Sequence, residues 1–147
     1  MATTFEAPTP HRPSRCQNPQ VRILLVEDVP ISQELACTIL RGAGHFVEFA
    51  NDGVEAVAAA EAGSFDLILM DIEMPRMDGF TAARRIRDLP GPAGQTPIVA
   101  MTAVAIPEEI RAFREAGMDG YIAKPFQQQE LLFAATDAPG LRFSRPY

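Results

Sequence analysis

Five chemically active side chains each follow a short apolar run of this chain. Glu27 and Asp28 follow the first run, Asp71 the third, Thr102 the fourth and Lys124 the fifth. Carboxylates, a hydroxyl and an ammonium group are the parts needed to transfer a phosphoryl group onto an aspartate, with a metal ion to neutralise charge on the transferring oxygens. The sequence therefore points to phosphoryl transfer, provided that the fold brings these residues together.

Lys124 is the only lysine, whereas the other twelve basic residues are arginines. Lysine is a compact, mobile point charge, whereas arginine is a rigid fork suited to flat, bidentate partners. One retained lysine indicates a site where arginine does not fit. An arginine-biased composition would by itself explain a single lysine. The functional interpretation of Lys124 therefore depends on the carboxylates, which supply an anionic partner for it.

The length and composition are those of one globular domain. The 147 residues are 47% hydrophobic and 22% charged, and the net charge of -6 argues against a nucleic-acid-binding surface. No apolar stretch approaches the roughly 18 residues of a membrane span. The N-terminus lacks a secretory signal, and two cysteines do not make a disulfide framework. We expect a reduced, cytoplasmic protein that binds neither nucleic acid nor membrane.

The chain divides into a body and two less regular ends. Residues 1–20 carry four prolines among polar residues, which predicts a flexible arm. Residues 137–147 form a loop-like C-terminal tail. The body, residues 21–136, alternates helical patterns with short apolar runs rich in branched or aromatic residues. These runs predict strands at 21–26, 46–50, 65–70, 97–101 and 120–123.

Apolar residues recur at helical spacing between the runs. Ile31, Leu35 and Ile39 are four residues apart, as are Ile106 and Ile110. The flanking sequences contain residues that are typical of helix ends. Asp52 with Glu55 is a capping-box pattern, Pro107 suits a first helical position, and Gly44 and Gly117 suit left-handed helix ends.

Five βα repeats imply a parallel sheet with helices on both faces, joined by right-handed crossovers. Ligands bind such sheets at the carboxyl ends of the strands. All five chemically active side chains are predicted at those ends, and Asp71 in particular must sit at the mouth of a buried strand.

Three carboxylates beside one lysine repel one another, because two like charges 4 Å apart cost about 4 kcal/mol at an effective dielectric constant near 20. A magnesium ion, which takes carboxylate, water and phosphate oxygens, would relieve this repulsion. A closed zinc site is excluded, since no Cys/His ligand spacing is present. His11 and His45 stand alone, and His45 is expected to be a turn residue before the second strand.

The order of these residues resembles the receiver domain of two-component response regulators. The resemblance covers residues 21–135, and any one of its four segments would be weak alone. The segments are Leu25-Val26-Glu27-Asp28, the run from Met70 to Gly79, Met101-Thr102-Ala103, and Tyr121-Ile122-Ala123-Lys124-Pro125-Phe126. The family's fold is an α/β, doubly wound, flavodoxin-like (βα)5 domain, whose five-stranded parallel sheet has the order 2-1-3-4-5.

The resemblance implies a role for each site residue. Asp71 would accept a phosphoryl group from phosphohistidine on a histidine kinase or a histidine phosphotransfer protein. Asp28, Asp71 and the backbone carbonyl of Glu73 would hold Mg²⁺ directly, and Glu27 would act through a water molecule. Lys124 would pair with Asp71 before transfer and with the phosphoryl group afterwards.

The resemblance also implies a switch. The Thr102 hydroxyl would move to the phosphoryl oxygen, and the Tyr121 ring would then turn inward. This change would alter the face formed by the fourth helix, the fifth strand and the fifth helix, through which relatives form phosphorylation-dependent homodimers. The Lys124-Pro125 bond would be cis, which proline makes accessible.

We expect no output domain in this chain, because nothing after Asp137 is long enough to bind DNA or to catalyse a reaction. We therefore expect either a single-domain response regulator or a receiver of a hybrid histidine kinase. Such a domain catalyses its own phosphorylation and dephosphorylation but does not turn over external substrates.

Three other functions remain open from the residues. One is an aspartyl-phosphate phosphatase, because Glu73 stands two residues after Asp71, where such enzymes place a proton donor; Met74-Pro75 does not match their motif. A flavodoxin-type ligand module would need a phosphate-binding loop after the first strand, where this chain is acidic. A phosphorylation-independent interaction domain is disfavoured by the complete set of Asp28, Asp71, Thr102 and Lys124.

Overall fold

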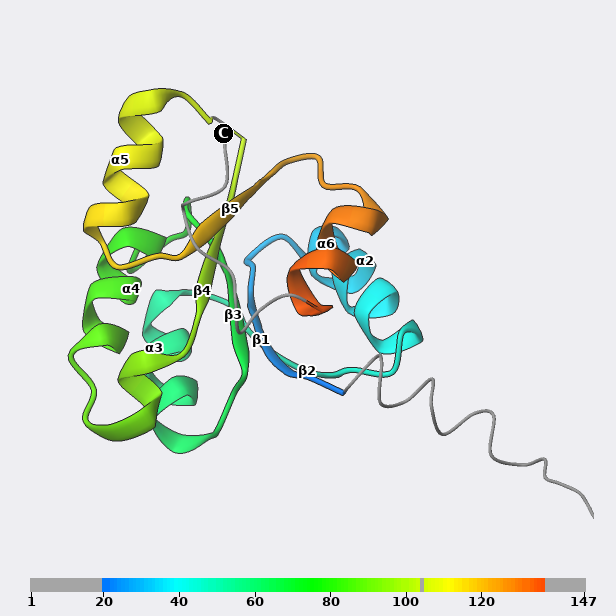
Figure 1. Cartoon of the computed structure of the whole chain (residues 1–147), viewed down its shortest axis with the longest axis horizontal. Helices are drawn as coiled ribbons and strands as arrows, with labels where there is room; N and C mark the ends of the chain where they lie inside the picture. The colour runs from blue at the N-terminus through cyan, green and yellow to red at the C-terminus, as the bar shows by residue number, and fades with distance from the viewer. Residues whose placement is uncertain (1–19, 104, 137–147) are drawn as a thin grey trace, which may run out of the picture.

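Five parallel strands form one sheet in the order β2-β1-β3-β4-β5, as predicted (Figure 1). The computed structural model describes residues 20–103 and 105–136. The predicted tail, and the predicted arm apart from Gln20, lie outside these residues. The strands are β1 (Arg22–Val26), β2 (Phe46–Ala50), β3 (Leu67–Asp71), β4 (Ile98–Thr102) and β5 (Gly120–Ala123).

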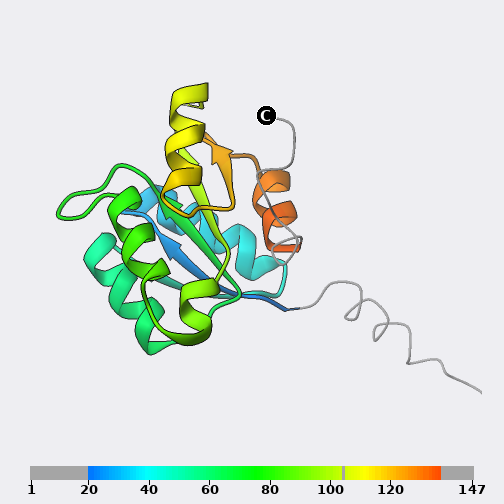
Figure 2. The same ribbon diagram turned by 60° about the vertical axis from the view of Figure 1, so that its left-hand side comes forward.

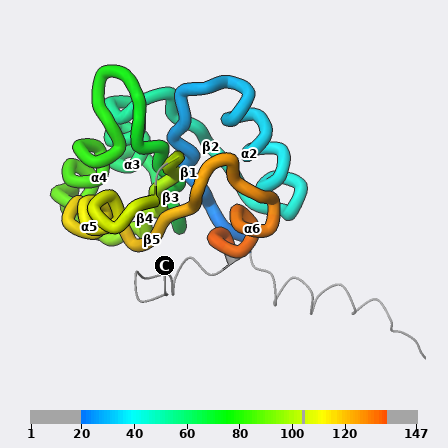
Figure 3. The backbone as a smooth tube through the Cα atoms, turned by 90° about the horizontal axis from the view of Figure 1, so that it is seen from above, coloured from blue at the N-terminus to red at the C-terminus, as the bar shows by residue number. Residues whose placement is uncertain are grey.

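Helices connect successive strands and cover both faces of the sheet. They are α2 (Pro30–Gly42), α3 (Gly53–Ala62), α4 (Gly79–Arg87), the 3-10 helix η1 (Gly91–Gln95), α5 (Pro107–Glu115) and α6 (Gln128–Thr136). Helices α2 and α6 lie on one face, and α3, α4 and α5 lie on the other (Figures 1 and 3). None of the helices in the described residues is long and apolar enough to cross a membrane.

The sheet separates two apolar clusters. Along β1, Ile23 and Leu25 point towards α2 and α6, whereas Leu24 and Val26 point towards α3 and α4. All four side chains are fully buried. Strands that are covered on both faces read as continuous apolar runs, which is why the sequence located them.

The predicted helix boundaries are also found. Asp52 Oδ1 accepts a hydrogen bond from the Glu55 amide at 2.9 Å, which caps α3. The Glu55 carboxylate accepts from the amide of Asn51, one residue earlier than in a standard capping box. Pro107 is the first residue of α5, and Gly44 and Gly117 have φ of +95° and +94°.

The spacing of Ile31, Leu35 and Ile39 correctly predicted helix α2, but it did not predict which face of the helix is buried. Ile31 is 76% exposed and Leu35 52% exposed, whereas the face packed on the sheet consists of Ala36, Cys37 and Leu40. The buried face of α2 thus combines two small residues with Leu40, and Ile31 and Leu35 are left towards solvent.

Two local expectations need correction. Strand β3 begins at Leu67 rather than at residue 65, and the Oδ2 of the preceding Asp66 accepts a hydrogen bond from the Arg22 amide at 3.0 Å. His45 does precede β2, but it is a buried partner and not only a turn residue. Its Nδ1 accepts a hydrogen bond from the Val21 amide at 3.0 Å, and burial lowers the pKa of the imidazole.

Because every strand runs in the same direction, all five carboxyl ends lie at one edge of the sheet (Figure 2). This edge carries the predicted functional residues.

Candidate functional site

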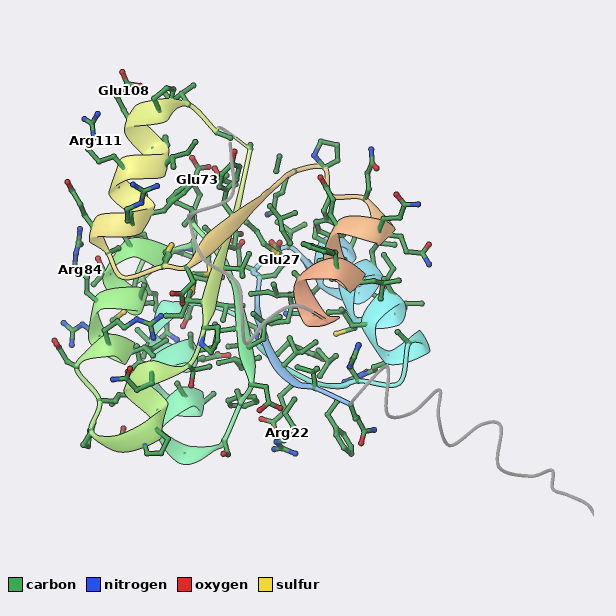
Figure 4. The ribbon with its side chains drawn as sticks, viewed as in Figure 1. Arg22, Glu27, Glu73, Arg84, Glu108 and Arg111 are labelled. Atoms are coloured by element: carbon green, nitrogen blue, oxygen red, sulfur yellow. The ribbon has the colours of Figure 1, made fainter. Side chains whose placement is uncertain are left out.

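Three carboxylates meet where β1 and β3 end. These strands are neighbours, with Val26 opposite Met70, so Glu27 and Asp28 emerge beside Asp71. One oxygen from each of the three carboxylates lies within 4.8 Å of the others. Glu27 is 1% exposed and Asp71 is 5% exposed, whereas Asp28 is half-buried. In Figure 4, Glu27 and Glu73 lie towards this edge, and Arg22 lies at the opposite end of the sheet.

Lys124 follows β5 and reaches this group. Its Nζ lies 2.8 Å from Glu27 Oε1 and 3.3 Å from Asp71 Oδ1, so the ammonium bridges two carboxylates. Its backbone amide donates to the Thr102 carbonyl at 2.7 Å, and its peptide bond with Pro125 is cis. The sequence had assigned Lys124 to Asp71 alone; its nearer partner is Glu27.

The Asp71 carboxyl has a strongly altered acidity. Burial, and then the neighbouring Glu27 carboxylate, raise the pKa of Asp71 to about 7, although Lys124 opposes this shift. Burial disfavours the charge on Lys124, but hydrogen bonding to Glu27 and the two carboxylate charges outweigh it and raise the pKa of Lys124. The site therefore favours an additional proton or cation near Asp71.

The donor set fits Mg²⁺. When all three carboxylates are ionised, they and the Lys124 ammonium carry a net charge of -2 in a largely buried group, and every candidate ligand atom is an oxygen. Within the described residues no histidine or cysteine joins this group. The exposed side chain of Glu73 is also outside it. Metal binding through the Glu73 backbone carbonyl remains a prediction.

Thr102 and Tyr121 lie on the side of the site formed by β4 and β5. Thr102 ends β4 and is buried, and β4 pairs with β3 so that Met101 is opposite Asp71. Tyr121 is half-buried in β5, with its ring 6.1 Å from the ring of Phe113 on α5. The structure thus places Thr102 at the end of the strand beside that of Asp71, and Tyr121 against α5. Their switching role remains a prediction.

The sequence did not reveal how the Glu27 segment is held. Its carboxylate Oε2 accepts from the Val29 amide at 3.1 Å, and its backbone carbonyl accepts from Gln33 Nε2 at 2.9 Å. The Glu27 amide donates to the carbonyl of Ala50 at 3.1 Å. The role of Gln33 could not be predicted, because one of its partners is a backbone carbonyl and the other, Asn51, is 18 residues away.

Gly79 ends the motif that begins at Met70, and the structure shows why this position is a glycine. A Cβ on Gly79 would lie 2.4 Å from the Asp71 carbonyl oxygen and 2.9 Å from the Ile72 Cα. The Gly79 amide also donates to the Ile72 carbonyl at 2.9 Å. Glycine thus allows α4 to begin directly against the backbone of Asp71.

We expect Asp28→Ala to raise the free energy of unfolding by about 1 kcal/mol without metal, because it removes one of the clustered like charges. Millimolar Mg²⁺ should stabilise the unsubstituted chain and have little effect on this variant. Thermal melts with and without Mg²⁺ measure both effects. Glu61→Ala, which removes an exposed carboxylate from α3, is the matched control. Equal responses of the two variants would contradict an assembled carboxylate group.

Comparison with known proteins agrees with this fold and site. The response regulator receiver domain family matches residues 23–136, and the chain belongs to this family. It is therefore a receiver domain of two-component signalling. Its predicted family and fold are both confirmed.

Particular relatives support this assignment. The two-component response regulator ORR41 of Oryza sativa subsp. japonica is 41% identical over 115 residues, which cover 76% of this chain and 88% of that protein. The receiver domain of sensor histidine kinase PA1611 from Pseudomonas aeruginosa PAO1 is 39% identical, with a TM-score of 0.70 over 80% of this chain and 98% of that one. That crystal structure has a magnesium ion coordinated in its active-site cleft.

A third similar structure is a Saccharomyces cerevisiae complex. It contains the histidine phosphotransfer protein Ypd1 and the receiver domain of its downstream response regulator Ssk1. The match is 30% identical, with a TM-score of 0.76 over 81% of this chain and 88% of that one. Several other curated relatives are much longer, and the chain spans only 11–17% of their length.

Proposed function

We propose that this receiver accepts a phosphoryl group from phosphohistidine onto Asp71, in the presence of Mg²⁺. One observation carries the proposal: the buried Asp71 carboxylate lies 3.3 Å from the Lys124 ammonium and shares a cluster of oxygen ligands with Glu27 and Asp28. A nucleophile, a cation for the phosphoryl oxygens and ligands for a metal are thereby combined at one place.

The transfer is a displacement at phosphorus. An Asp71 oxygen forms a bond to phosphorus while the bond between phosphorus and the donor imidazole nitrogen breaks. The imidazole leaves with the bonding electron pair and takes up a proton. Lys124 lies between Glu27 and Asp71 and would turn its ammonium towards the phosphoryl oxygens.

The chain's own residues would hold the metal. The carboxylates of Asp28 and Asp71 and the backbone carbonyl of Glu73 would bind Mg²⁺ directly, and Glu27 would bind it through water. When bound, Mg²⁺ would neutralise charge on the transferring oxygens and favour the ionised form of Asp71.

The donor is a histidine kinase or a histidine phosphotransfer protein. Several curated relatives are named as sensor or histidine kinases, and the yeast complex pairs a receiver with Ypd1. The chain would therefore work in a cytoplasmic phosphorelay, either alone or as the receiver of a hybrid kinase. It would be phosphorylated stoichiometrically and would not turn over external substrates.

Phosphorylation would then bias the α5-β5-α6 surface, the fourth helix, fifth strand and fifth helix of the predicted fold. The Thr102 hydroxyl would bind the phosphoryl group, and Tyr121 would pack inward beside Phe113. A new anion that is bound better in one of two conformations shifts the population towards it. The same surface would support a phosphorylation-dependent homodimer.

Asp71→Asn should abolish labelling by a small-molecule phosphodonor such as acetyl phosphate. With Mg²⁺, the unsubstituted chain should gain one phosphoryl group. Hydroxylamine should remove it, because an acyl phosphate is a mixed anhydride that hydroxylamine attacks at the carbonyl carbon, releasing phosphate. Intact-mass spectrometry measures the gain. Asp66→Asn, a change in an exposed carboxylate at the other end of β3, should leave labelling intact. Labelling that persists in Asp71→Asn would contradict the proposal, and multiple turnovers of a phosphomonoester would favour a phosphatase.

A further inference from the structure

The loop between β3 and α4 contains a backbone conformation that needs an explanation. Among the described non-glycine residues, Arg76 alone has a positive φ, at 66°. This left-handed region is unfavourable for residues with a long side chain. The loop also contains Glu73, whose carbonyl the proposed function uses. An interaction that holds Arg76 in place would therefore act close to the metal site.

Arg76 is held by an ion pair with Asp52. Its Nε and Nη2 lie 2.6 and 2.5 Å from the same oxygen, Asp52 Oδ2. The Asp52 side chain is 9% exposed, and its other oxygen accepts from the Glu55 amide. The Glu55 amide, opposed by burial and supported by Arg76, lowers the pKa of Asp52. One aspartate thus caps α3 and fixes the loop.

The residue after Asp52 contacts the same loop. A Cβ on Gly53 would lie 2.4 Å from the Met77 carbonyl oxygen and 2.8 Å from the Met77 Cβ, so only glycine allows α3 and the loop to approach this closely. The first turn of α3 therefore meets the loop at two successive residues, Arg76 and Met77.

The segment before α3 is joined to the other ligand-bearing loop. Gln33 Nε2 donates both to the Glu27 carbonyl, at 2.9 Å, and to Asn51 Oδ1, at 3.0 Å. The carbonyl of Ala50 accepts the Glu27 amide. Residues 50–53 thus connect the Glu27-Asp28 loop on one side with the Arg76-Met77 loop on the other.

We infer that the Asp52–Arg76 ion pair positions the magnesium ligands. It fixes the loop that carries Glu73 relative to the loop that carries Glu27 and Asp28, and its loss weakens Mg²⁺ binding. Arg76 and Asp52 are positioning residues, since neither belongs to the carboxylate group itself. The inference rests on the proposed function because it concerns the same metal.

Charge alone makes a different prediction. Removing the Asp52 charge should weaken cation binding, whereas removing the Arg76 charge should strengthen it, because a nearby cation opposes Mg²⁺. Positioning predicts weaker binding in both cases. Arg76→Asn is therefore the decisive variant, and asparagine tolerates the left-handed conformation. Asp52→Asn is its counterpart, because asparagine still caps a helix.

Isothermal titration with MgCl₂ alone should give a Kd about tenfold higher for each variant, the lower end of the effect of removing groups that orient metal ligands. The double variant should bind no more weakly than either single one, because both remove the same interaction. Acetyl phosphate at saturating Mg²⁺ should still label Asp71 in all three. Arg84→Asn, an exposed arginine on α4 away from Glu27 in Figure 4, is the control and should leave the Kd unchanged.

An unchanged or lower Kd for Arg76→Asn would overturn the inference while leaving the proposed function intact. If Asp52→Asn does not fold, Arg76→Asn and Arg76→Lys decide, because lysine keeps the charge and should restore part of the affinity. Absence of Mg²⁺ binding by the unsubstituted chain would overturn both. Labelling that persists in Asp71→Asn would overturn the proposed function alone.

Discussion

Arg87→Met should lower the free energy of unfolding by about 3 kcal/mol, as expected when one partner of a largely buried ion pair is removed. The Arg87 guanidinium donates to the carbonyls of Gly117, Gly94 and Thr96 at 2.8, 3.0 and 2.7 Å. It also pairs with Asp119 Oδ2 at 2.8 Å. This one side chain therefore joins the end of α4 to η1, to the start of β4 and to the turn before β5.

Methionine keeps much of the apolar stem but leaves four acceptors without this donor. Unsatisfied buried acceptors cost about 1–3 kcal/mol each where water cannot reach them. Gly94 and Thr96 are buried, whereas Gly117 and Asp119 are partly accessible and can recover hydrogen bonds from water. Asp119 Oδ2 would retain only the Ile98 amide, at 3.0 Å. Urea unfolding followed by circular dichroism measures the loss. Arg85→Met, at an exposed position of the same helix, should change stability little; an equal loss in both variants would refute the network's importance.

Stability without metal should fall as the pH rises from about 4 to about 7. The pKa of Asp71 is about 7 in the folded chain, against an ordinary value of 3.8. Between these values the folded chain keeps a proton that the unfolded chain has released, so folding weakens with rising pH. The whole shift corresponds to about 4 kcal/mol, and we expect about 2 kcal/mol because the proton is shared with the Glu27 and Lys124 cluster.

Asp71→Asn should abolish this fall, since an amide stays neutral. At about pH 8 the variant should be more stable than the unsubstituted chain by the same amount, and near pH 4 the two should agree. Mg²⁺ should remove the difference at the higher pH. His45 has a pKa lowered by burial and favours folding as the pH rises to 6.5, but it acts equally in both chains. Parallel pH profiles of the two chains would show that Asp71 ionises normally.

The site at the carboxyl edge of the sheet could be predicted because it depends only on the hydrophobic periodicity and on the direction of the strands. Apolar runs locate buried strands, five βα repeats make them parallel, and parallel strands bring the residues after them to one edge. Glu27, Asp71 and Lys124 followed from this reasoning without knowledge of any contact. Local capping was equally readable, since Asp52 and Glu55 are only three residues apart.

Interactions between distant residues could not be predicted in the same way. Arg87 and Asp119 are 32 residues apart, and Arg76 and Asp52 are 24 apart. The chain contains twelve arginines and many carboxylates, so their pairing depends on loop paths that periodicity does not specify. The exposed Ile31 shows a related limit: periodicity reveals a helix, but packing against the sheet decides which of its faces is buried.

The single lysine has a practical consequence for handling this protein. Reagents that acylate ε-amino groups can modify only one side chain among the 147 residues, and that side chain bridges Glu27 and Asp71. Amine-reactive surfaces and succinimidyl esters would modify either the terminal α-amino group or Lys124, and each modification of Lys124 would disrupt the carboxylate group. The same chemistry offers a footprint, because the yield of modification at Lys124 reports directly how accessible its ammonium is.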